Sequence, residues 1–207
     1  VAEIKVPFSH PRDRLDPDFR QLVDDVYARM TARPVSEHVR KTLKAGTRLP
    51  QVSINLIAGL IETLAAAPYE GRADMPDIAH SLHLEVDDLF PIAEVLQLMG
   101  FADIREGDIF LTPAAIAFAQ ADTQPRKVMF AEHLLRFIPL AALIKNVLDE
   151  RVDHRAPRVR FEQELEDTLS DSAAKETLDT VIHWGRYAEI FSYNDQTALF
   201  SLEDVEF

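Results

Sequence analysis

The chain has 207 residues, of which 47% are hydrophobic and 28% charged, and its 22 Lys and Arg against 35 Asp and Glu give a formal net charge of −13. This apolar fraction is that of a folded protein with a core, so a chain disordered throughout is excluded. The sequence contains no Cys, which excludes disulfides, thiolate metal sites and a cysteine nucleophile. The acidic balance repels nucleic-acid phosphates unless basic residues gather locally.

Neither nucleotide-binding loops nor membrane segments are indicated. No two of the six glycines have the spacing of a P-loop or of a dinucleotide-binding loop. The most apolar stretches, 52–67 and 134–148, are interrupted by polar and charged residues and are shorter than the roughly 20 apolar residues of a spanning helix. The first residues also lack the pattern of a secretory signal. We therefore expect a cytoplasmic protein with no direct membrane insertion, and the absence of an initial Met suggests a piece of a longer product.

The first 34 residues predict a strand over Glu3–Phe8 and a helix over Pro17–Thr31. The strand has no partner strand nearby in the sequence. Residues 35–50 belong to a basic, apolar-poor stretch that begins at Arg29. We interpret residues 35–50 as a basic linker and a candidate domain boundary.

Three stretches with an apolar period near 3.6 follow and predict three helices. They are 54–64, Asp74–Leu82 and Val86–Met99. Gly100 fits the position just after the third helix. Apolar and polar residues then alternate on both sides of Glu106-Gly107, which predicts a hairpin over 101–112. Three helices and a hairpin follow the winged-helix order, so we predict a first winged-helix-like unit over 51–122.

The same order returns about 85 residues later and predicts a second winged-helix-like unit over 123–207. Its predicted elements are helices at Arg126–Glu150, Val159–Leu169 and Ser172–Trp184, then two strands within Tyr187–Leu202 around Asn194-Asp195. The alignment places Gly185 opposite Gly100, and a helix over Pro113–Ala121 joins the units. The predicted fold class is therefore mainly α with small β-hairpins, arranged as tandem winged-helix-like units.

A winged helix suggests DNA binding through its third helix. Between Leu84 and Gly100, however, the sequence has four acidic residues and no Lys or Arg. Such a helix would be repelled by the phosphates and would release almost no counterions. We therefore expect a protein-interaction or dimerisation module. The basic clusters at Arg29–Arg48 and Arg151–Arg160 fit either solvated segments or a docking surface for an acidic partner or for the rest of the parent protein.

The residues that could carry chemistry form no recognisable catalytic or metal site. His80 and His83 have helical spacing for a metal pair but lack a third ligand, so we expect surface histidines and no metal. His133 and His183 lie within predicted helices, where partial burial is expected. No serine stands in a Gly-x-Ser-x-Gly motif.

The densest aromatic group surrounds four consecutive residues, Trp184, Gly185, Arg186 and Tyr187. In the structural interpretation Trp184 closes the core, Gly185 caps the helix and Tyr187 starts the wing. In the alternative they anchor an interface, where Trp, Tyr and Arg contribute most of the binding energy. We favour the structural interpretation.

Three segments, Leu96–Pro113, 117–122 and Asp179–Phe191, together resemble the AAA-associated C-terminal domain, which follows the ATPase of nitrate/sulfonate/taurine-type ABC importers. The resemblance covers about residues 51–202, and Trp-Gly-Arg-Tyr-Ala-Glu is its most specific part. Residues 1–34 resemble the last strand and helix of such an ATPase domain.

The resemblance implies a non-catalytic accessory or regulatory domain of an ABC transporter ATP-binding subunit. ATP is implied only for a parent ATPase domain, because this chain lacks a P-loop, and no cofactor is expected in the chain itself. The implied partners are the ATPase domain and the transporter permease. The residues themselves add a second copy of the chain as an expected partner, and their charge pattern argues against nucleic acid. Two alternatives stay open: a winged-helix DNA-binding transcriptional regulator, and a small-molecule sensor with an apolar pocket between the two units.

Overall fold

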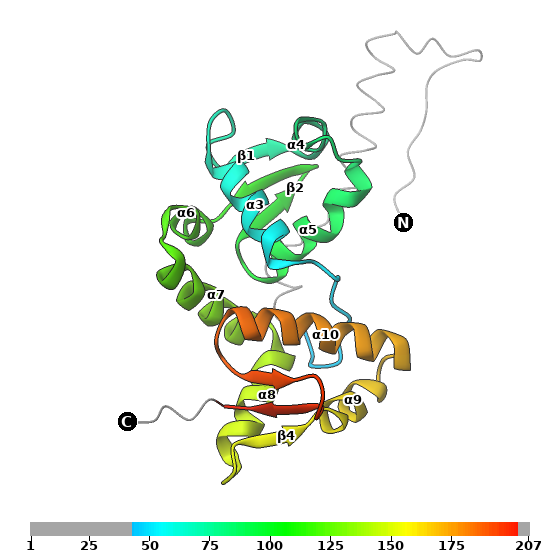
Figure 1. The fold of residues 1–207 in the computed structure, drawn as a ribbon. Helices are drawn as coiled ribbons and strands as arrows, with labels where there is room; N and C mark the ends of the chain where they lie inside the picture. The colour runs from blue at the N-terminus through cyan, green and yellow to red at the C-terminus, as the bar shows by residue number, and fades with distance from the viewer. Residues whose placement is uncertain (1–42, 203–207) are drawn as a thin grey trace, which may run out of the picture.

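The computed structural model describes residues 43–202, which form eight helices and six short strands (Figure 1). The strand and helix expected within residues 1–34 lie outside the described residues. In chain order the elements are α3 (Ile54–Ala65), β1 (Arg72–Asp74), α4 (Met75–Leu82), α5 (Val86–Leu98), β2 (Ala102–Arg105), β3 (Asp108–Leu111), α6 (Pro113–Gln120), α7 (Thr123–Phe137), α8 (Pro139–Glu150), β4 (Arg155–Pro157), α9 (Val159–Glu166), α10 (Asp171–Tyr187), β5 (Ser192–Asn194) and β6 (Leu199–Ser201). The predicted class, mainly α with small β-hairpins, is confirmed.

The element order helix, strand, helix, helix, strand, strand occurs twice. It runs once from α3 to β3 and again from α8 to β6, and α6 and α7 connect the two sets. Each set has a three-stranded antiparallel sheet in which the last strand is central, in the orders β1-β3-β2 and β4-β6-β5. We call the two sets the first unit (α3 to β3) and the second unit (α8 to β6).

Local sequence signals explain the ends of the elements in the first unit. The side chain of Asp74 accepts a hydrogen bond from the backbone N–H of Asp77 and so caps α4, which has a proline in its first turn. The predicted hairpin turn lies at Glu106-Gly107, where both residues have positive φ, 54° and 91°. That conformation is the one a two-residue hairpin loop requires, and glycine adopts it without steric cost.

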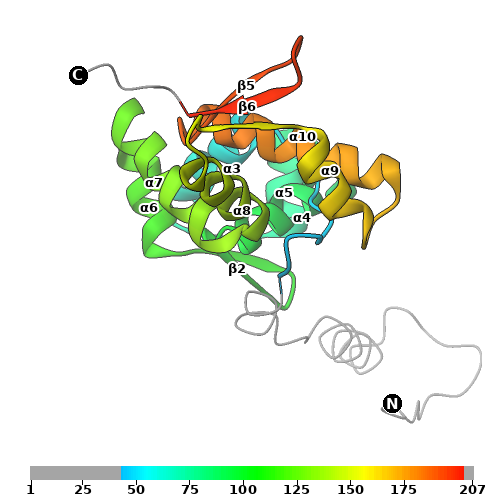
Figure 2. The ribbon, with the colours of Figure 1, turned by 90° about the horizontal axis from the view of Figure 1, so that it is seen from below.

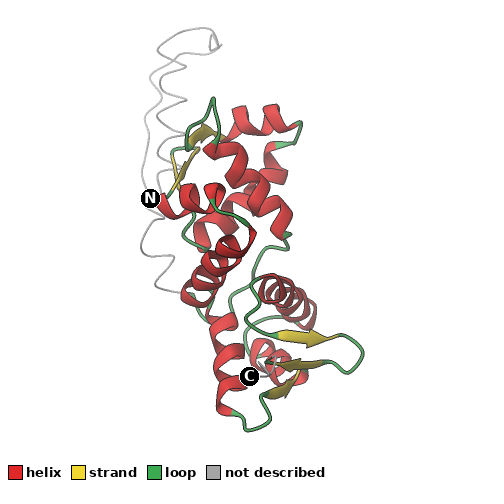
Figure 3. Ribbon diagram, turned by 60° about the vertical axis from the view of Figure 1, so that its left-hand side comes forward, coloured by secondary structure: helices red, strands yellow, loops and turns green. Residues whose placement is uncertain are grey.

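The prediction of one long helix over Arg126–Glu150 is wrong, because this range contains two helices, α7 and α8, that are separated at Ile138 (Figure 3). Ile138 lies between them with φ −112° and ψ 96°, an extended conformation. The cause is Pro139, whose ring disfavours a helical conformation for the preceding residue and whose nitrogen carries no hydrogen to donate. Proline is nevertheless well suited to begin α8, since the first helical N–H needs no partner within the helix.

The prediction that Gly185 ends the third helix of the second unit is also wrong. Helix α10 continues to Tyr187, and the residue with left-handed backbone is Glu189, with φ 57°. Glu189 therefore corresponds to Gly100, which has φ 74° after α5. The backbone bonds agree, since Phe101 N–H donates to the Leu96 carbonyl at 2.8 Å and the N–H of Ile190 to the carbonyl of Gly185 at 3.1 Å.

Two strands, β1 and β4, were not predicted. Each has three residues with a buried alanine at its centre, and these alanines stand opposite Ile109 in β3 and Phe200 in β6. A three-residue segment with one apolar side chain is too short to show an alternating pattern. The second hairpin also starts later than expected, at Ser192 rather than near Tyr187.

The buried residues of both units belong to one hydrophobic cluster. Helix α10 lies across the middle of the molecule, between the first unit and the second sheet (Figure 1), and it contacts α3, α7, α8 and α9. Seen from below, α9 lies beside α10, and the hairpin of β5 and β6 follows α10 on the other side (Figure 2). In the part of the chain described here, no helix is both long enough and apolar enough to cross a membrane.

Candidate functional site

The junction between the two units contains most of the residues singled out in the sequence, and a segment that we call the strap, residues 43–52, passes through it. The strap follows α10: Leu49 is buried, and its N–H donates to Thr177 Oγ1 at 3.4 Å. Arg48 forms an ion pair with Glu176 at 3.1 Å. Residues 35–42 lie outside the described residues. The described part of the predicted linker is therefore packed against the second unit and is not simply a solvated connection.

Trp184 fastens the strap to α10. Its side chain is fully buried, and its indole Nε1–H donates to the carbonyl oxygen of Val52 at 2.9 Å. The bond is buried and joins residues 132 positions apart in the sequence. Because the carbonyl of Val52 comes directly before the cap of α3, Trp184 holds the start of the first unit against the third helix of the second.

Gly185 allows the wing of the second unit to close on α10. A Cβ at this position would lie 2.2 Å from Cζ of Phe191, well below any real contact. Phe191 is 4% exposed, and its ring meets that of Phe200 edge-on at 5.4 Å. The glycine is therefore required for a close approach of an aromatic ring and not for a left-handed backbone.

Arg186 and Tyr187 point to different surroundings. Arg186 is exposed and forms an ion pair with Asp195 in the hairpin turn at 3.3 Å. Tyr187 is half-buried, and its ring meets that of Phe130 in α7 at 5.3 Å and 89°. Burial raises the pKa of the Tyr187 hydroxyl, and the positive charge of Arg126 opposes this effect only in part. Of the four consecutive residues Trp184–Tyr187, three thus pack inside the structure, and the fourth, Arg186, is an exposed cation.

The start of α7 is held by ion pairs to both units. Arg126 binds Glu62 of α3, donates to the carbonyl of Ala119 at 3.2 Å and lies over the ring of Phe118 at 5.2 Å. The next residue, Lys127, pairs with Glu189 after α10. Consecutive side chains on one helix therefore connect the first unit with the second.

The histidines take structural or surface positions. The ring of His133 stacks on Phe101 at 4.3 Å, and its Nδ1 lies 2.7 Å from the carbonyl oxygen of Met99, as expected for a partly buried histidine with one satisfied nitrogen. His183 is exposed, so its expected burial is wrong. His80 and His83 are exposed as predicted, and the described residues contain no group of three potential ligands that could hold a metal.

The basic cluster Arg151–Arg160 is largely neutralised by carboxylates. Arg158 bonds to Glu162 and, at 2.6 Å, to Asp179 of α10. Burial alone would lower the pKa of Arg158, but its bonds to these acids and to Tyr193 outweigh burial and raise it. Because Arg158 lies between α9, α10 and the hairpin, it acts as a structural cation within the second unit.

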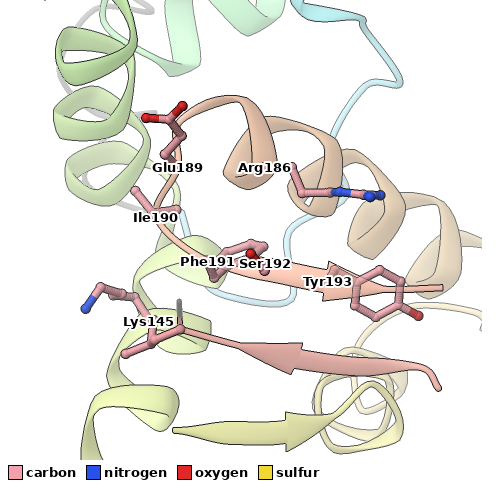
Figure 4. A pocket seen from close by; sticks show the side chains of 8 residues that line it. Lys145, Arg186, Glu189, Ile190, Phe191, Ser192 and Tyr193 are labelled. Atoms are coloured by element: carbon pink, nitrogen blue, oxygen red, sulfur yellow. The ribbon is translucent and has the colours of Figure 1, made fainter. Parts of the chain in front are cut away.

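Open grooves surround the junction. One, of about 730 Å³, is lined by Lys145 of α8, Arg186 of α10 and the start of β5 (Figure 4). A second, about 550 Å³, lies between residues 51–55 and the polar face of α10 up to His183. A third, about 460 Å³, lies between α5, the strap and α10. Charged side chains line each of these grooves, among them Glu189 in the first, Asp179 in the second and Arg48 in the third.

Sequence reasoning missed the contacts of Trp184 with Val52 and of Gly185 with Phe191, and the role of Thr177 as the acceptor for the N–H of Leu49. One signal for them was present. In α10, Thr177, Thr180 and Trp184 recur at spacings of three and four and form a second buried stripe beside the apolar one. Two buried stripes indicate a helix that packs on two sides.

Residues 43–202 thus form two mainly helical units that are joined through α10 and the strap. Residues 76–194, more than half of the chain, match the family described as the C-terminal AAA-associated domain, and the chain belongs to this family. The match confirms the resemblance and identifies an accessory domain linked to AAA/ABC ATPases. No curated protein and no solved structure matches the chain.

Proposed function

We propose that this chain is a non-catalytic regulatory and docking domain of the ATP-binding subunit of an ABC importer of the nitrate/sulfonate/taurine type, on the cytoplasmic side of the membrane. One observation carries the proposal: the strap, which brings the chain from its N-terminal side, is fixed between both units by the buried bond from Trp184 to Val52. Any movement of the preceding part of the chain is therefore coupled mechanically to both units.

The mechanism is a coupling between two sites. A partner such as the permease, the ATPase domain or a second copy of the chain binds the units and favours one position of the strap. That position favours either the separated or the closed arrangement of the two ATPase subunits, to the extent that the partner binds the two states with different affinity. The chain needs no cofactor for this role, and ATP belongs to the parent ATPase domain.

The test compares the complete transporter with a version that lacks residues 43–202. We expect the truncated transporter to lose regulation of its ATPase rate, or to assemble less well with the permease in a pulldown. A second variant, Trp184→Phe, keeps an aromatic ring but removes the donor to Val52, and it should weaken regulation while leaving the ATPase domain intact. Unchanged assembly together with unchanged regulation in both variants would contradict the proposal.

A second candidate, a winged-helix transcriptional regulator, is favoured by the twice-repeated order helix, strand, helix, helix, strand, strand. Two features weigh against it. The third helix of the first unit, α5, is acidic, and the corresponding helix α10 is covered by the strap and by α3 and α7. We expect no mobility shift with promoter DNA at low salt, where phosphate contacts are strongest. A salt-dependent shift would favour this second candidate.

A further inference from the structure

One side of α5 presents an unpartnered surface. Asp87, Phe90, Pro91 and Glu94 follow one another at spacings of three, one and three, so they share one side of the helix. All four are exposed, and the Phe90 side chain is 49% exposed. Leu84, just before the helix, is exposed to 36%. We call this side, with its apolar centre, the α5 face.

The α5 face is strongly acidic. Asp87 and Glu94 lie on it, Glu85 and Asp88 flank it, and all four carboxylates are exposed; within residues 43–202 none of them takes part in an ion pair. Partial desolvation of its side chain raises the pKa of Glu94. The surface therefore lacks its positive complement in the described part of the chain.

The strap passes along one end of this face. Pro91 and Glu94 line the 460 Å³ groove together with residues 48–51 of the strap and Glu176 of α10. The chain thus enters the described structure beside the acidic surface. An occupant that arrives with the strap is already close to it.

The segment directly before the strap has the matching chemistry. Residues 29–42 contain four cations, Arg29, Arg33, Arg40 and Lys41, and one acid, Glu37, which gives four minus one, a net charge of +3. Apolar residues, among them Val35 and Val39, alternate with the charges. We propose that segment 29–42 binds the α5 face of its own chain, with its cations on the carboxylates and its apolar side chains on Phe90.

The distances permit this contact. Arg48 lines the groove beside Glu94, and Val39 precedes Arg48 by nine residues, which span at most about 30 Å when fully extended. From Asp87 to Glu94 the face measures only about 10 Å along the helix. Because segment and face belong to one chain, binding is intramolecular, and the effective concentration is on the order of millimolar. The inference goes beyond the proposed function and does not depend on it.

The absence of Cys from the whole chain allows a direct test. Val39→Cys is combined with Pro91→Cys on the α5 face or, as the control, with Val152→Cys, which lies in a fully exposed loop after α8. We expect a bifunctional thiol reagent to cross-link the first pair at least about tenfold faster than the control pair, since docking raises the local concentration. The advantage should disappear at about 1 M salt, where the Debye length falls to about 3 Å.

Neutralising the face separates charge pairing from mere proximity. Asp87→Asn with Glu94→Gln should slow the cross-link between positions 39 and 91, whereas the matched pair Glu132→Gln with Glu166→Gln, exposed acids on α7 and α9, should leave it unchanged. The unmodified protein gives an independent reading: a carbodiimide should join Lys41 to carboxylates of the α5 face, identified by mass spectrometry. Equal rates for both cysteine pairs, a rate insensitive to salt, or cross-linked dimers as the main product would each overturn the proposal.

Discussion

Gly185 offers the sharpest test of how the second unit closes. Alanine at this position of α10 would place a Cβ 2.2 Å from Cζ and 2.7 Å from both Cε atoms of Phe191. Atoms cannot approach so closely, so the ring of Phe191 must leave its place against the helix. Since that ring is 4% exposed and packs on Phe200, the wing must shift with it.

The size of the effect follows from opposing contributions. Alanine favours a helix over glycine by about 1 kcal/mol. Displacing Phe191 forfeits much of the roughly 1.5–3 kcal/mol gained by burying its side chain and of the roughly 0.5–1.5 kcal/mol from its edge-on contact with Phe200. Gly185→Ala should therefore lower the free energy of unfolding by about 1–3 kcal/mol, in the range found for overpacked cores.

Gly59→Ala provides the matched control, because Gly59 lies within α3 and a Cβ there would meet nothing within 4 Å. The same substitution should therefore stabilise the protein at this site by about 0.5–1 kcal/mol. Urea unfolding followed by circular dichroism measures both variants. If Gly185→Ala stabilises the chain as Gly59→Ala does, the ring of Phe191 does not pack on α10 and our account of the glycine is wrong.

Three further predictions concern the junction and the hairpins. Trp184→Phe should lower the free energy of unfolding by about 2–4 kcal/mol in urea, since it leaves the buried carbonyl of Val52 without its donor and opens a cavity; a loss below about 0.5 kcal/mol would show that this bond does not hold the strap. Ala198→Gly should raise the melting temperature, because Ala198 has φ 51° and a left-handed backbone costs a residue with a Cβ about 1–2 kcal/mol, whereas Gly107→Ala, at φ 91°, should lower it; equal shifts would refute this reasoning. Burial raises the pKa of Tyr187 above the unfolded value of 10.0, so the stability linked to it is present below pH 10 and is lost as the pH rises through the folded value. Thermal melts above pH 10 should therefore show the wild type losing more stability than Tyr187→Phe, and parallel losses would contradict the shift.

Periodicity and turn chemistry predicted most of the first unit. The apolar spacing from Ile54 onward and the Glu106-Gly107 turn are local signals, and local signals suffice where an element is long or its turn needs a special backbone. The second unit was harder because its equivalent of Gly100 is Glu189, a residue that gives no sign of its positive φ. The alignment matched Gly100 with Gly185 instead. The role of Gly185, however, is to make room for the ring of Phe191, six residues later in the sequence.

The junction was the least predictable part of the site. The indole of Trp184 was expected in a core. Its hydrogen-bond partner, however, is the backbone carbonyl of Val52, 132 residues away, and the type of side chain at a position does not indicate such a backbone partner. Residues 43–50 of the strap were interpreted as part of a linker because the longer stretch from Arg29 to Pro50 is rich in cations. Its buried apolar residues, Leu49 and Val52, were too few to show a period.

The long sequence separation between Val52 and Trp184 also sets the order in which this chain can mature during synthesis. The elements of the first unit, from α3 to β3, contact one another over short stretches of chain and can assemble as soon as they emerge from the ribosome. Leu49 and Val52 have no cover from α10 until residues 171–187 have been made. A chain halted before that point therefore lacks the helix to which Leu49 and Val52 of the strap are bonded.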